Sequence, residues 1–395
     1  MKIVDVCAFY TPHGGGVKTY VERKLAAGPE LGHEIAIIAP GAEDGVESWG
    51  DGARIVTLKA PHFPLDTNYF YFNDIAMLHA AITAEKPDIL EASSPWRSPS
   101  QTAKWPGQAP RVLIMHSDPL SAYAYRWFGR ILAQPTIDRH FEWFWRHLRR
   151  LDQAYDSVIC ANTDLANRLI EGGLTKVVTN PMGVEAGIFS PTLRDEGLRA
   201  RLLARCALGP EATLLLGVGR HAPEKRWTMV IDAVMAASYD RPVGLVLLGD
   251  GRERKRIIRH AKGNPHIHFL KPLSNRGELA SLLASADALI HGCEAETFGM
   301  VAAEARASGL PLIVPDRGGV ADQARNPGSL LYTANSSASA AQAIRSFIDS
   351  GREKARALTV ADAPHVRTMD QHFRDLFEHY QVLRDQARAN IAQAG

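Results

Sequence analysis

Two glutamates, Glu296 and Glu304, lie eight positions apart in the segment ETFGMVAAE. An apolar run typical of a buried strand precedes the first, and alanines that favour a helix surround the second. We therefore expect Glu296 in the loop at a strand's carboxyl end and Glu304 inside the following helix. Open α/β sheets bind their ligands at that edge.

The backbone N–H groups of Phe298, Gly299 and Met300 stand at the start of the same expected helix. The first N–H groups of a helix have no partner within it, and the helix dipole adds partial positive charge there. Such a terminus binds anions, and a diphosphate is the natural ligand. The alternative is that both glutamates are solvated helix residues without a binding role.

Two cations, Arg220 and Lys225, follow another expected strand in the segment GRHAPEK. At a strand's carboxyl end they can neutralise a diphosphate leaving group as its charge develops. A solvated charged loop is the alternative interpretation, and the position at the sheet edge favours the functional one.

Glycines 14–16 follow the first apolar run, and His116 follows the run at residues 112–115. Gly15 and Gly16 would let a ligand approach the backbone closely at a helix start. The loop matches neither GxGxxG nor a Walker A sequence, so a plain tight turn is an equal alternative. His116 could touch the reacting sugar or the acceptor, although a lone histidine in this setting is more often structural.

Short apolar runs alternate with helical stretches along the chain, which predicts parallel sheets covered on both faces. A first series and a second series are separated near residues 187–199, where Pro191 and charged residues interrupt the pattern. The first series is 3–8, 34–39, 54–58, 88–92, 112–115 and 157–161; the second is 213–218, 243–248, 267–270, 288–291, 312–314 and 329–332.

Two doubly wound domains facing a cleft are therefore expected, formed by residues 1–190 and 191–365. Residues 366–395 form a long amphipathic helix, which we expect to rejoin the first domain. Its apolar stripe is interpreted as packing rather than as a cofactor site.

Composition excludes several classes. Lys plus Arg total 45 against 43 for Asp plus Glu, so nothing indicates a nucleic-acid partner. The four cysteines are scattered, which favours buried thiols in a reducing compartment over a zinc site. The amino terminus is too short and too polar for a signal peptide, and no apolar run approaches the ~20 residues of a membrane span. We expect a cytoplasmic protein, either free or peripheral on the inner face of the membrane.

Residues 123–150 concentrate tryptophan and phenylalanine among arginines. Aromatic side chains with basic neighbours suit docking to an anionic lipid surface, and a lipid-linked acceptor would follow. Equally, the rings could fill the core of the first domain while the arginines are solvated.

These features together resemble the retaining glycosyltransferases of family 4, which have the GT-B fold. The resemblance spans nearly the whole chain, and its specific parts are GRxxxEK followed by two glutamates eight positions apart. The other matching parts are the glycine loop, His116, the stretch MGVEAGIFSP at 182–191 and the turn GDG at 249–251.

The resemblance implies that residues 1–190 form the acceptor side and 191–365 the donor side, and it implies a role for each matching residue. Arg220 and Lys225 would hold the donor diphosphate with Gly15 and Gly16 against it, and Glu304 would bind the ribose. Glu296 and the backbone of 298–300 would contact the donor sugar and phosphates, while His116 would approach the reacting centre.

Retention would proceed by attack on the same face, with the departing phosphate helping to remove the acceptor proton. The chain has no Asp-x-Asp segment, so no metal and no cofactor is expected. The departures from the family are Glu185 where Asp is common, His291 where Ser or Pro is common, and Asp322 where Glu is common. They concern sugar identity rather than the phosphate positions.

The leading hypothesis is a transferase that moves a sugar from a UDP- or GDP-sugar to a hydroxyl acceptor, either a membrane lipid or a lipid-linked glycan. A nucleotide-sugar epimerase of the same fold and a non-catalytic nucleotide-sugar binding protein are the alternatives. The base, the sugar and the acceptor are left open.

Overall fold

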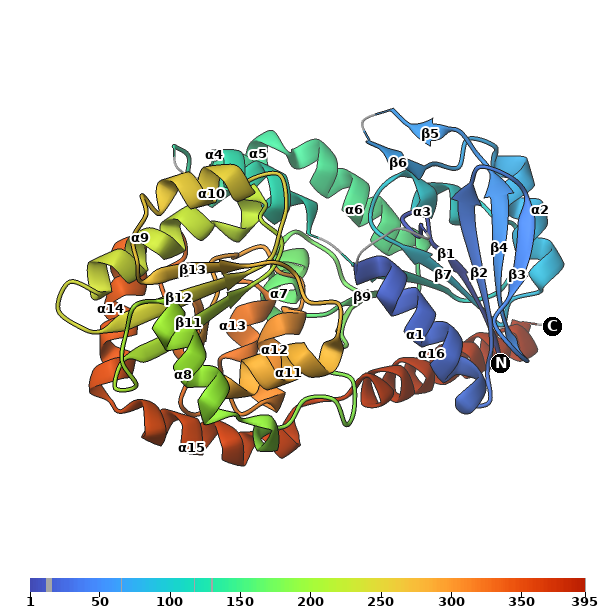
Figure 1. Ribbon diagram of the computed structural model, residues 1–395. Coiled ribbons are helices and arrows are strands. Elements are labelled where there is room, and N and C mark those ends of the chain that lie inside the picture. Colours follow the sequence, from blue (N-terminus) through green and yellow to red (C-terminus); the bar gives the residue numbers. More distant parts are fainter. Residues whose placement is uncertain (12–15, 65, 117, 129–130, 395) are drawn as a thin grey trace.

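Two parallel sheets covered by helices form two lobes that lie side by side (Figure 1). The computed structural model describes residues 1–11, 16–64, 66–116, 118–128 and 131–394. The strands of one sheet all come from residues 2–179 and those of the other from residues 213–332. The α/β architecture expected from the alternating pattern is confirmed.

The first sheet has eight strands in the order β10-β9-β8-β7-β1-β2-β4-β3. Its strands run parallel except for β3, which pairs antiparallel with β4. In the central register, Ile3 lies opposite Ile35 on one side and Ile89 on the other. The strands are β1 (Lys2–Val6), β2 (Glu34–Gly41), β3 (Gly45–Ser48), β4 (Ala53–Lys59), β7 (Ile89–Ser93), β8 (Arg111–Met115), β9 (Ser157–Cys160) and β10 (Val177–Thr179).

The second sheet has six parallel strands in the order β13-β12-β11-β14-β15-β16. Its central strands are buried along their whole length, because helices cover both faces. The strands are β11 (Thr213–Val218), β12 (Val243–Leu248), β13 (Ile267–Leu270), β14 (Ala288–Ile290), β15 (Leu312–Pro315) and β16 (Leu330–Tyr332).

The helices of the first lobe are α1 (Gly16–Glu30), α2 (Ile75–Glu85), α3 (Arg97–Thr102), α4 (Arg126–Phe128), α5 (Gln134–His140), α6 (Glu142–Ala154) and α7 (Thr163–Glu171), with the π-helical η1 (Leu120–Tyr125). Those of the second are α8 (Glu196–Arg205), α9 (Trp227–Ala237), α10 (Arg254–His260), α11 (Arg276–Ser285), α12 (Met300–Ala307), α13 (Gly319–Gln323), α14 (Ser337–Asp349) and α15 (Arg352–Asp362). Short 3-10 turns are η2 (Pro191–Leu193), η3 (Pro223–Lys225) and η4 (Ala363–His365).

Four strands were missed by the sequence patterns: β3, β10 and the antiparallel pair β5 (His62–Phe63) and β6 (Asp66–Phe70). Each has a physical reason. All of β3 is exposed, so it shows no buried face, and β5 and β10 have only two and three residues. An apolar pattern identifies strands that are buried in the core, whereas these strands form by pairing with a neighbouring strand.

The last helix, α16 (Met369–Ala394), returns to the first lobe and lies beside α1 (Figure 1). Its ring stripe is buried: Phe373, Phe377 and Tyr380 pack with Tyr20 and the strands of the first sheet. Burial of each such side chain contributes about 1.5–3 kcal/mol, which fixes the helix to this lobe.

The two segments that connect the lobes run side by side. Val184 donates its N–H to the carbonyl of Arg367 at 2.9 Å, and Met369 donates to the carbonyl of Val184 at 2.9 Å. Gly183 is required here, because a Cβ would lie 2.1 Å from the carbonyl carbon of Thr368. The glycine of the MGVE stretch thus permits close contact between two backbones.

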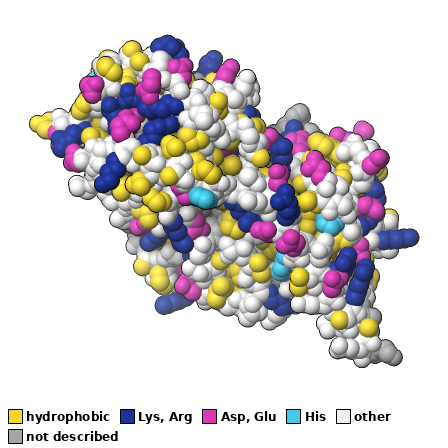
Figure 2. Space-filling view, turned by 90° about the horizontal axis from the view of Figure 1, so that it is seen from below, with side chains coloured by type: hydrophobic (Ala, Val, Ile, Leu, Met, Phe, Trp, Pro, Cys, Tyr) yellow, Lys and Arg dark blue, Asp and Glu magenta, His cyan; other side chains and the backbone are white. Residues whose placement is uncertain are grey.

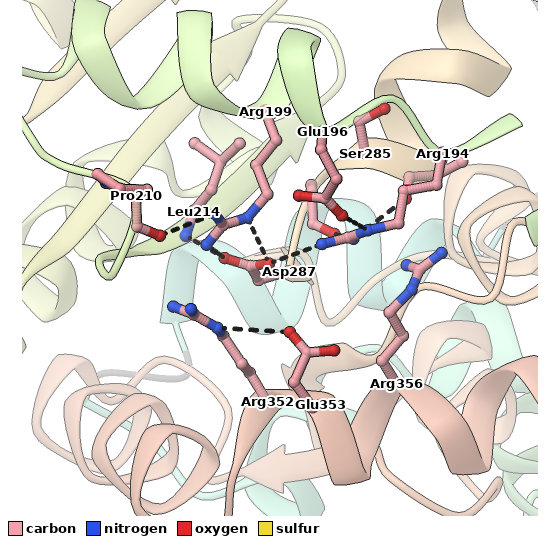
Figure 3. A network of polar contacts seen from close by, with 12 residues as sticks. Arg194, Glu196, Arg199, Pro210, Leu214, Ser285, Asp287, Arg352, Glu353 and Arg356 are labelled. Atoms are coloured by element: carbon pink, nitrogen blue, oxygen red, sulfur yellow. Dashed lines mark hydrogen bonds and ion pairs between the residues drawn. The ribbon is translucent and has the colours of Figure 1, made fainter.

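A buried carboxylate, Asp287, anchors the second lobe's first helix and strand (Figure 3). Arg199 of α8 donates to Asp287 from Nε at 2.9 Å and from Nη2 at 2.8 Å. The same guanidinium donates to the carbonyls of Pro210 and Ala212, and Leu214 donates its N–H to Asp287. Because these polar groups are satisfied, the segment after residue 190 is held against the second sheet.

The face seen from below shows acidic and basic side chains interspersed (Figure 2). That mixture agrees with the near balance of 45 basic and 43 acidic residues. Basic side chains can therefore predominate only over part of the surface.

Candidate active site

Lys225 and Glu296 form an ion pair at the carboxyl edge of the second sheet. Lys225 ends η3, and Glu296 lies in the loop after β14, as predicted; Lys225 Nζ pairs with Glu296 Oε1. His291 Nε2 lies 3.3 Å from the same oxygen. Burial opposes ionisation of Glu296, but Lys225 and His291 hold the pKa of its carboxyl well below the usual value. The glutamate is therefore a carboxylate.

Lys225 is likewise in its charged form. Burial alone would lower the pKa of its ammonium, but Glu296 keeps that pKa above the usual value. The lysine retains partial access to solvent, with 14% of its side chain exposed. It can therefore exchange its carboxylate partner for an incoming anion.

Arg220 lies outside this pair. It follows β11 directly, its side chain is 79% exposed, and its Nη2 lies 3.2 Å from Glu224 Oε1. Its positive charge acts on Lys225, so the two cations are neighbours at one sheet edge. This exposure leaves Arg220 free to turn toward a ligand.

The turn at 249–251 packs against the loop that contains Arg220. A Cβ on Gly249 would lie 2.0 Å from the carbonyl oxygen of Gly219, and one on Gly251 would lie 2.7 Å from that of His221. Both glycines have positive φ, at 156° and 148°. The GDG sequence is thus explained by close backbone packing that supports the loop of the two cations.

The start of α12 presents unpaired donors. Gly299 caps the helix with φ 82°, in the left-handed region that favours glycine. Among the described residues, no partner accepts from the N–H groups of Phe298, Gly299 and Met300. A Cβ on Gly299 would also lie 2.7 Å from Val320 Cγ1. The helix start and its unpaired N–H groups therefore lie where the sequence predicts them, and anion binding there stays a prediction.

Glu304 lies one turn inside α12 and is almost completely buried. Arg276, at the start of α11, donates from Nη2 to Glu304 Oε1 at 2.7 Å. Burial raises the pKa of Glu304, and Arg276 opposes that rise. Sequence patterns did not identify Arg276, because it lies 28 positions from Glu304 and belongs to no local motif.

Arg276 also connects the two lobes. Its guanidinium lies over the ring of Phe189 at 5.0 Å, and its Nε is 3.8 Å from Glu185 Oε2. Glu185 in turn pairs with Arg23 of α1. A chain of alternating charges therefore runs from the first lobe to Glu304.

His116 follows β8 and faces the cleft from the first lobe. It shares a small cavity of about 30 Å³ with Thr297, the neighbour of Glu296 in the second lobe. Burial lowers the pKa of His116 to about 4, so the imidazole is neutral at pH 7. The structure thus brings His116 next to the loop of Glu296, although 180 positions separate them in the sequence.

A buried polar network supports His116 from behind. Its Nε2 lies 3.2 Å from Ser93 Oγ, which donates to Asp5 Oδ1 at 3.1 Å. Lys24 Nζ lies 3.1 Å from Asp5 Oδ2 and 2.6 Å from Glu91 Oε2, and both pairs are fully buried. Tyr380 of α16 donates to Glu91 at 2.5 Å. The last helix is therefore linked by hydrogen bonds to the histidine.

Two hydrogen bonds close the lobes on each other. Asn162 donates from Nδ2 to the carbonyl of Thr297 at 2.6 Å. Thr163, at the start of α7, donates its N–H to Asp322 Oδ2 at 2.7 Å. Asp322 is one of the departures from the family pattern, and its carboxylate here contacts a helix start in the opposite lobe.

Only Gly16 of the glycine loop at residues 14–16 lies within the described residues. Helix α1 begins at Gly16, and nothing lies within 4 Å of a Cβ built there. Gly15 lies outside the described residues. The remaining site residues all lie at the carboxyl edges of the two sheets.

The aromatic and basic segment at residues 123–150 agrees in part with core packing and in part with an exposed docking surface. Phe144 and Trp145 are buried in the core with Leu148 and Leu151. In contrast, Trp127 and Trp143 are exposed. The segment therefore both fills the core and presents rings to the surface.

A groove of about 740 Å³ opens beside these exposed rings, at the carboxyl edge of the first sheet. Pro119 and Leu120 line it, only a few positions after His116. Its aromatic lining is Phe9, Phe63, Tyr69, Phe70, Tyr71, Phe72, Trp96, Tyr123, Trp127, Phe141, Trp143 and Phe144.

Two features are absent from the described part of the chain. No three His, Cys, Asp or Glu residues there are grouped so as to hold a metal ion. No helix there is long and apolar enough to cross a membrane. The four cysteines are all buried and unpaired.

Comparison with known proteins gives matches in both lobes. Residues 14–187 match the family described as Glycosyltransferase Family 4, and residues 205–361 match Glycosyl transferases group 1. A "GDP-mannose-dependent alpha-(1-6)-phosphatidylinositol dimannoside mannosyltransferase" of Mycobacterium tuberculosis (strain ATCC 25177 / H37Ra) is 33% identical over 318 residues, 80% of this chain and 79% of that protein.

A "GDP-mannose-dependent alpha-mannosyltransferase" of M. tuberculosis (strain CDC 1551 / Oshkosh) is 31% identical, over 82% of this chain and 81% of that protein. Among solved structures, a glycosyltransferase from Rickettsia africae superposes with a TM-score of 0.69 at 17% identity, covering 97% of this chain and 98% of that one. The structural likeness establishes the GT-B fold.

Proposed function

This chain belongs to the family 4 glycosyltransferases, and from that premise we propose that it transfers mannose from GDP-mannose to a hydroxyl group of an inositol phospholipid. Glycosyl transfer from a nucleotide sugar is its activity. The epimerase and the non-catalytic binding protein have no support. The observation that carries the proposal is 33% identity to a mannosyltransferase over 80% of the chain.

The proposed donor site uses the charged edge of the second sheet. The diphosphate lies against the free N–H groups at the start of α12, with Lys225 and Arg220 neutralising its charge. Lys225 exchanges Glu296 for the phosphates, and Glu296 then accepts hydrogen bonds from the sugar. Gly15 and Gly16 approach the diphosphate from the first lobe. No metal is needed in this arrangement.

The ribose binds to Glu304, which must then share or release Arg276. A buried carboxylate that already holds one cation has further acceptor capacity for two ribose hydroxyls. Arg276 stays close by and can reach the nucleotide. The ion pair with Arg276 thus neutralises the charge of Glu304 when no donor is bound.

The reacting centre lies where His116 meets the loop of Glu296. A cavity of about 30 Å³ holds roughly one water molecule, so the lobes must separate to admit a sugar. The hydrogen bonds of Asn162 and Thr163 to the second lobe are the contacts that break. The neutral His116 then offers a hydrogen bond to the sugar or to the acceptor, and retention leaves an α-linked product.

The acceptor side is proposed to work at the inner surface of the membrane, with the exposed rings and arginines of residues 123–150 in contact with anionic lipid. By their names, both relatives depend on GDP-mannose, and one of them is a phosphatidylinositol dimannoside mannosyltransferase. The acceptor head group reaches the cleft from this side.

One assay tests donor and acceptor together. The purified protein is incubated with radiolabelled GDP-mannose, UDP-glucose or ADP-glucose and with phosphatidylinositol mannosides in detergent. Label should enter the organic phase from GDP-mannose, and NMR of the product should show an α-linkage. Faster transfer from a uridine donor, or transfer only to water-soluble sugars, would overturn the proposal.

A further inference from the structure

The groove beside His116 is an apolar site that the donor chemistry does not use. Its volume of about 740 Å³ lies within the ~300–1,000 Å³ typical of small-molecule sites. Rings from the β5–β6 hairpin, η1 and the start of α6 form most of its wall. A sugar would find few hydrogen-bonding groups there, whereas a hydrocarbon chain would find continuous apolar contact.

The mouth of the groove leaves large rings in solvent. Trp143 is 57% exposed and Trp96 is 40% exposed, and both line the groove. Isolated exposed apolar residues are common, but rings gathered around one cavity mark a binding surface.

Positive charge stands at the same mouth. Arg97 lines the groove and is exposed, and Arg146 lies one turn after Trp143 on α6. Within the described part of the chain, neither arginine is within ion-pair distance of a carboxylate, whereas Arg149 of the same helix pairs with Glu142. An apolar cavity with unpaired cations at its rim is complementary to a molecule that has a phosphate next to a hydrocarbon chain.

The groove also lies close along the chain to the proposed reacting centre. His116 directly follows β8, and Pro119 and Leu120, three and four positions later, form part of the groove wall. A ligand with its chain in the groove and its phosphate at Arg97 would therefore extend its head group toward His116.

We propose that this groove holds one acyl chain of the glycerophospholipid acceptor, drawn out of the bilayer while the head group enters the cleft. This inference rests on the proposed function, and it adds the part of the acceptor that the first lobe recognises. The acceptor is then selected by its chain as well as by its head group.

Chain length gives a direct test. The acceptors are phosphatidylinositol mannosides with dibutanoyl or dioctanoyl chains, used below their micelle concentrations. Each buried methylene contributes about fourfold in affinity, so KM should fall at least ~10-fold from the shorter to the longer chain. The double variant W96S/W143S should reduce this ratio to within about twofold of one. Trp49→Ser, an exposed tryptophan outside the groove, should keep the full ratio.

A binding measurement separates this inference from the proposed function. Dioctanoyl phosphatidylinositol with brominated chains should quench the tryptophan fluorescence of the wild type, and the same fractional quenching of the tryptophans that remain in W96S/W143S should need at least ~10-fold more lipid. Quenching without any mannosyl transfer would overturn the proposed function and leave the groove assignment standing. Transfer with no dependence on chain length, or equal quenching in the double variant, would overturn the groove assignment.

Two further outcomes would replace the acyl chain with another occupant. Tighter competition by farnesyl phosphate than by the dioctanoyl lipid would assign the groove to a prenyl chain. Self-association at micromolar concentration that W96S/W143S abolishes would assign it to a second copy of the protein.

Discussion

Lys24 in the first lobe and Lys225 in the second each pair with carboxylates, yet their surroundings differ. Lys24, a residue of α1 that pairs with Asp5 and Glu91, has 0% of its side chain exposed. Lys225, with Glu296, has 14% exposed and opens on the cleft. A sealed ion pair has no route to exchange partners, whereas an accessible one can release its carboxylate to an anion. The comparison favours a structural role for the first cluster and supports the proposed donor binding at the second.

Replacing Lys24 by methionine should give the largest effect. Two carboxylates would lose the cation that pairs with both of them in a sealed site, which costs about 3–5 kcal/mol of unfolding free energy. Urea unfolding at pH 7.5 measures this loss. Lys18→Met on the same helix is the control, because its exposed pair with Glu22 should contribute less than about 0.5 kcal/mol. Equal losses in both variants would remove the distinction between sealed and exposed pairs.

Lys225→Ala should instead affect turnover. Removing a charge that stabilises the leaving diphosphate should lower kcat/KM for the donor by about 10²–10³-fold. Lys255→Ala, on the exposed side of α10, should stay within about twofold of wild type. If Lys225→Ala retains wild-type rates, the cluster in the second lobe is structural, like that of Lys24.

Acid should weaken the first lobe before the donor cluster. Burial lowers the pKa of His372, next to Tyr20, to about 4. In the unfolded chain this imidazole is protonated below about pH 6.5, whereas in the folded chain it stays neutral down to about pH 4. The free energy of unfolding therefore falls as the pH drops from 6.5 toward 4. At pH 5 this loss is about 2 kcal/mol. The pKa of Glu296 is depressed, so its contribution persists above its unfolded pKa and is lost only at stronger acidity.

The measurement is urea unfolding at pH 7 and pH 5 for wild type and His372→Gln. The variant should lose less stability between the two pH values by about 2 kcal/mol. The wild type is compared with the variant because other groups also change the stability over this pH range. Burial raises the pKa of Glu91, so that carboxyl makes the folded state more stable as the pH falls. His365→Gln, at an exposed position, is the matched control. Parallel pH profiles for wild type and His372→Gln would contradict the expectation.

The smallest effect is expected at the exposed pair between the lobes. Arg23 and Glu185 are both partly exposed, and such pairs contribute about 0–1 kcal/mol. Arg23→Gln should shift the urea midpoint only slightly and keep donor kcat/KM within about twofold. A tenfold loss of kcat/KM would show that the charge chain from Arg23 through Glu185 to Arg276 acts on the donor site.

Local sequence predicted much of the fold and most of the charged residues of the candidate site. The expected strands at 213–218, 243–248 and 267–270 form at those residues, because continuous apolar runs must be buried in a parallel sheet. The positions of Glu296 in a loop and Glu304 inside a helix followed in the same way. Short strands such as β10 were missed, since three residues show no pattern.

The partners of these residues were decided by the tertiary structure. Arg276 reaches Glu304 because α11 packs beside α12, and Lys24 of α1 meets both Asp5 and Glu91 because β1 and β7 are neighbours in the sheet. The groove likewise assembles from segments between residues 8 and 144. Periodicity and propensity depend on near neighbours in the chain and so are visible in the sequence. Ion-pair partners, cavities and the division of the tryptophans between core and surface depend on how distant elements pack, which no local pattern records.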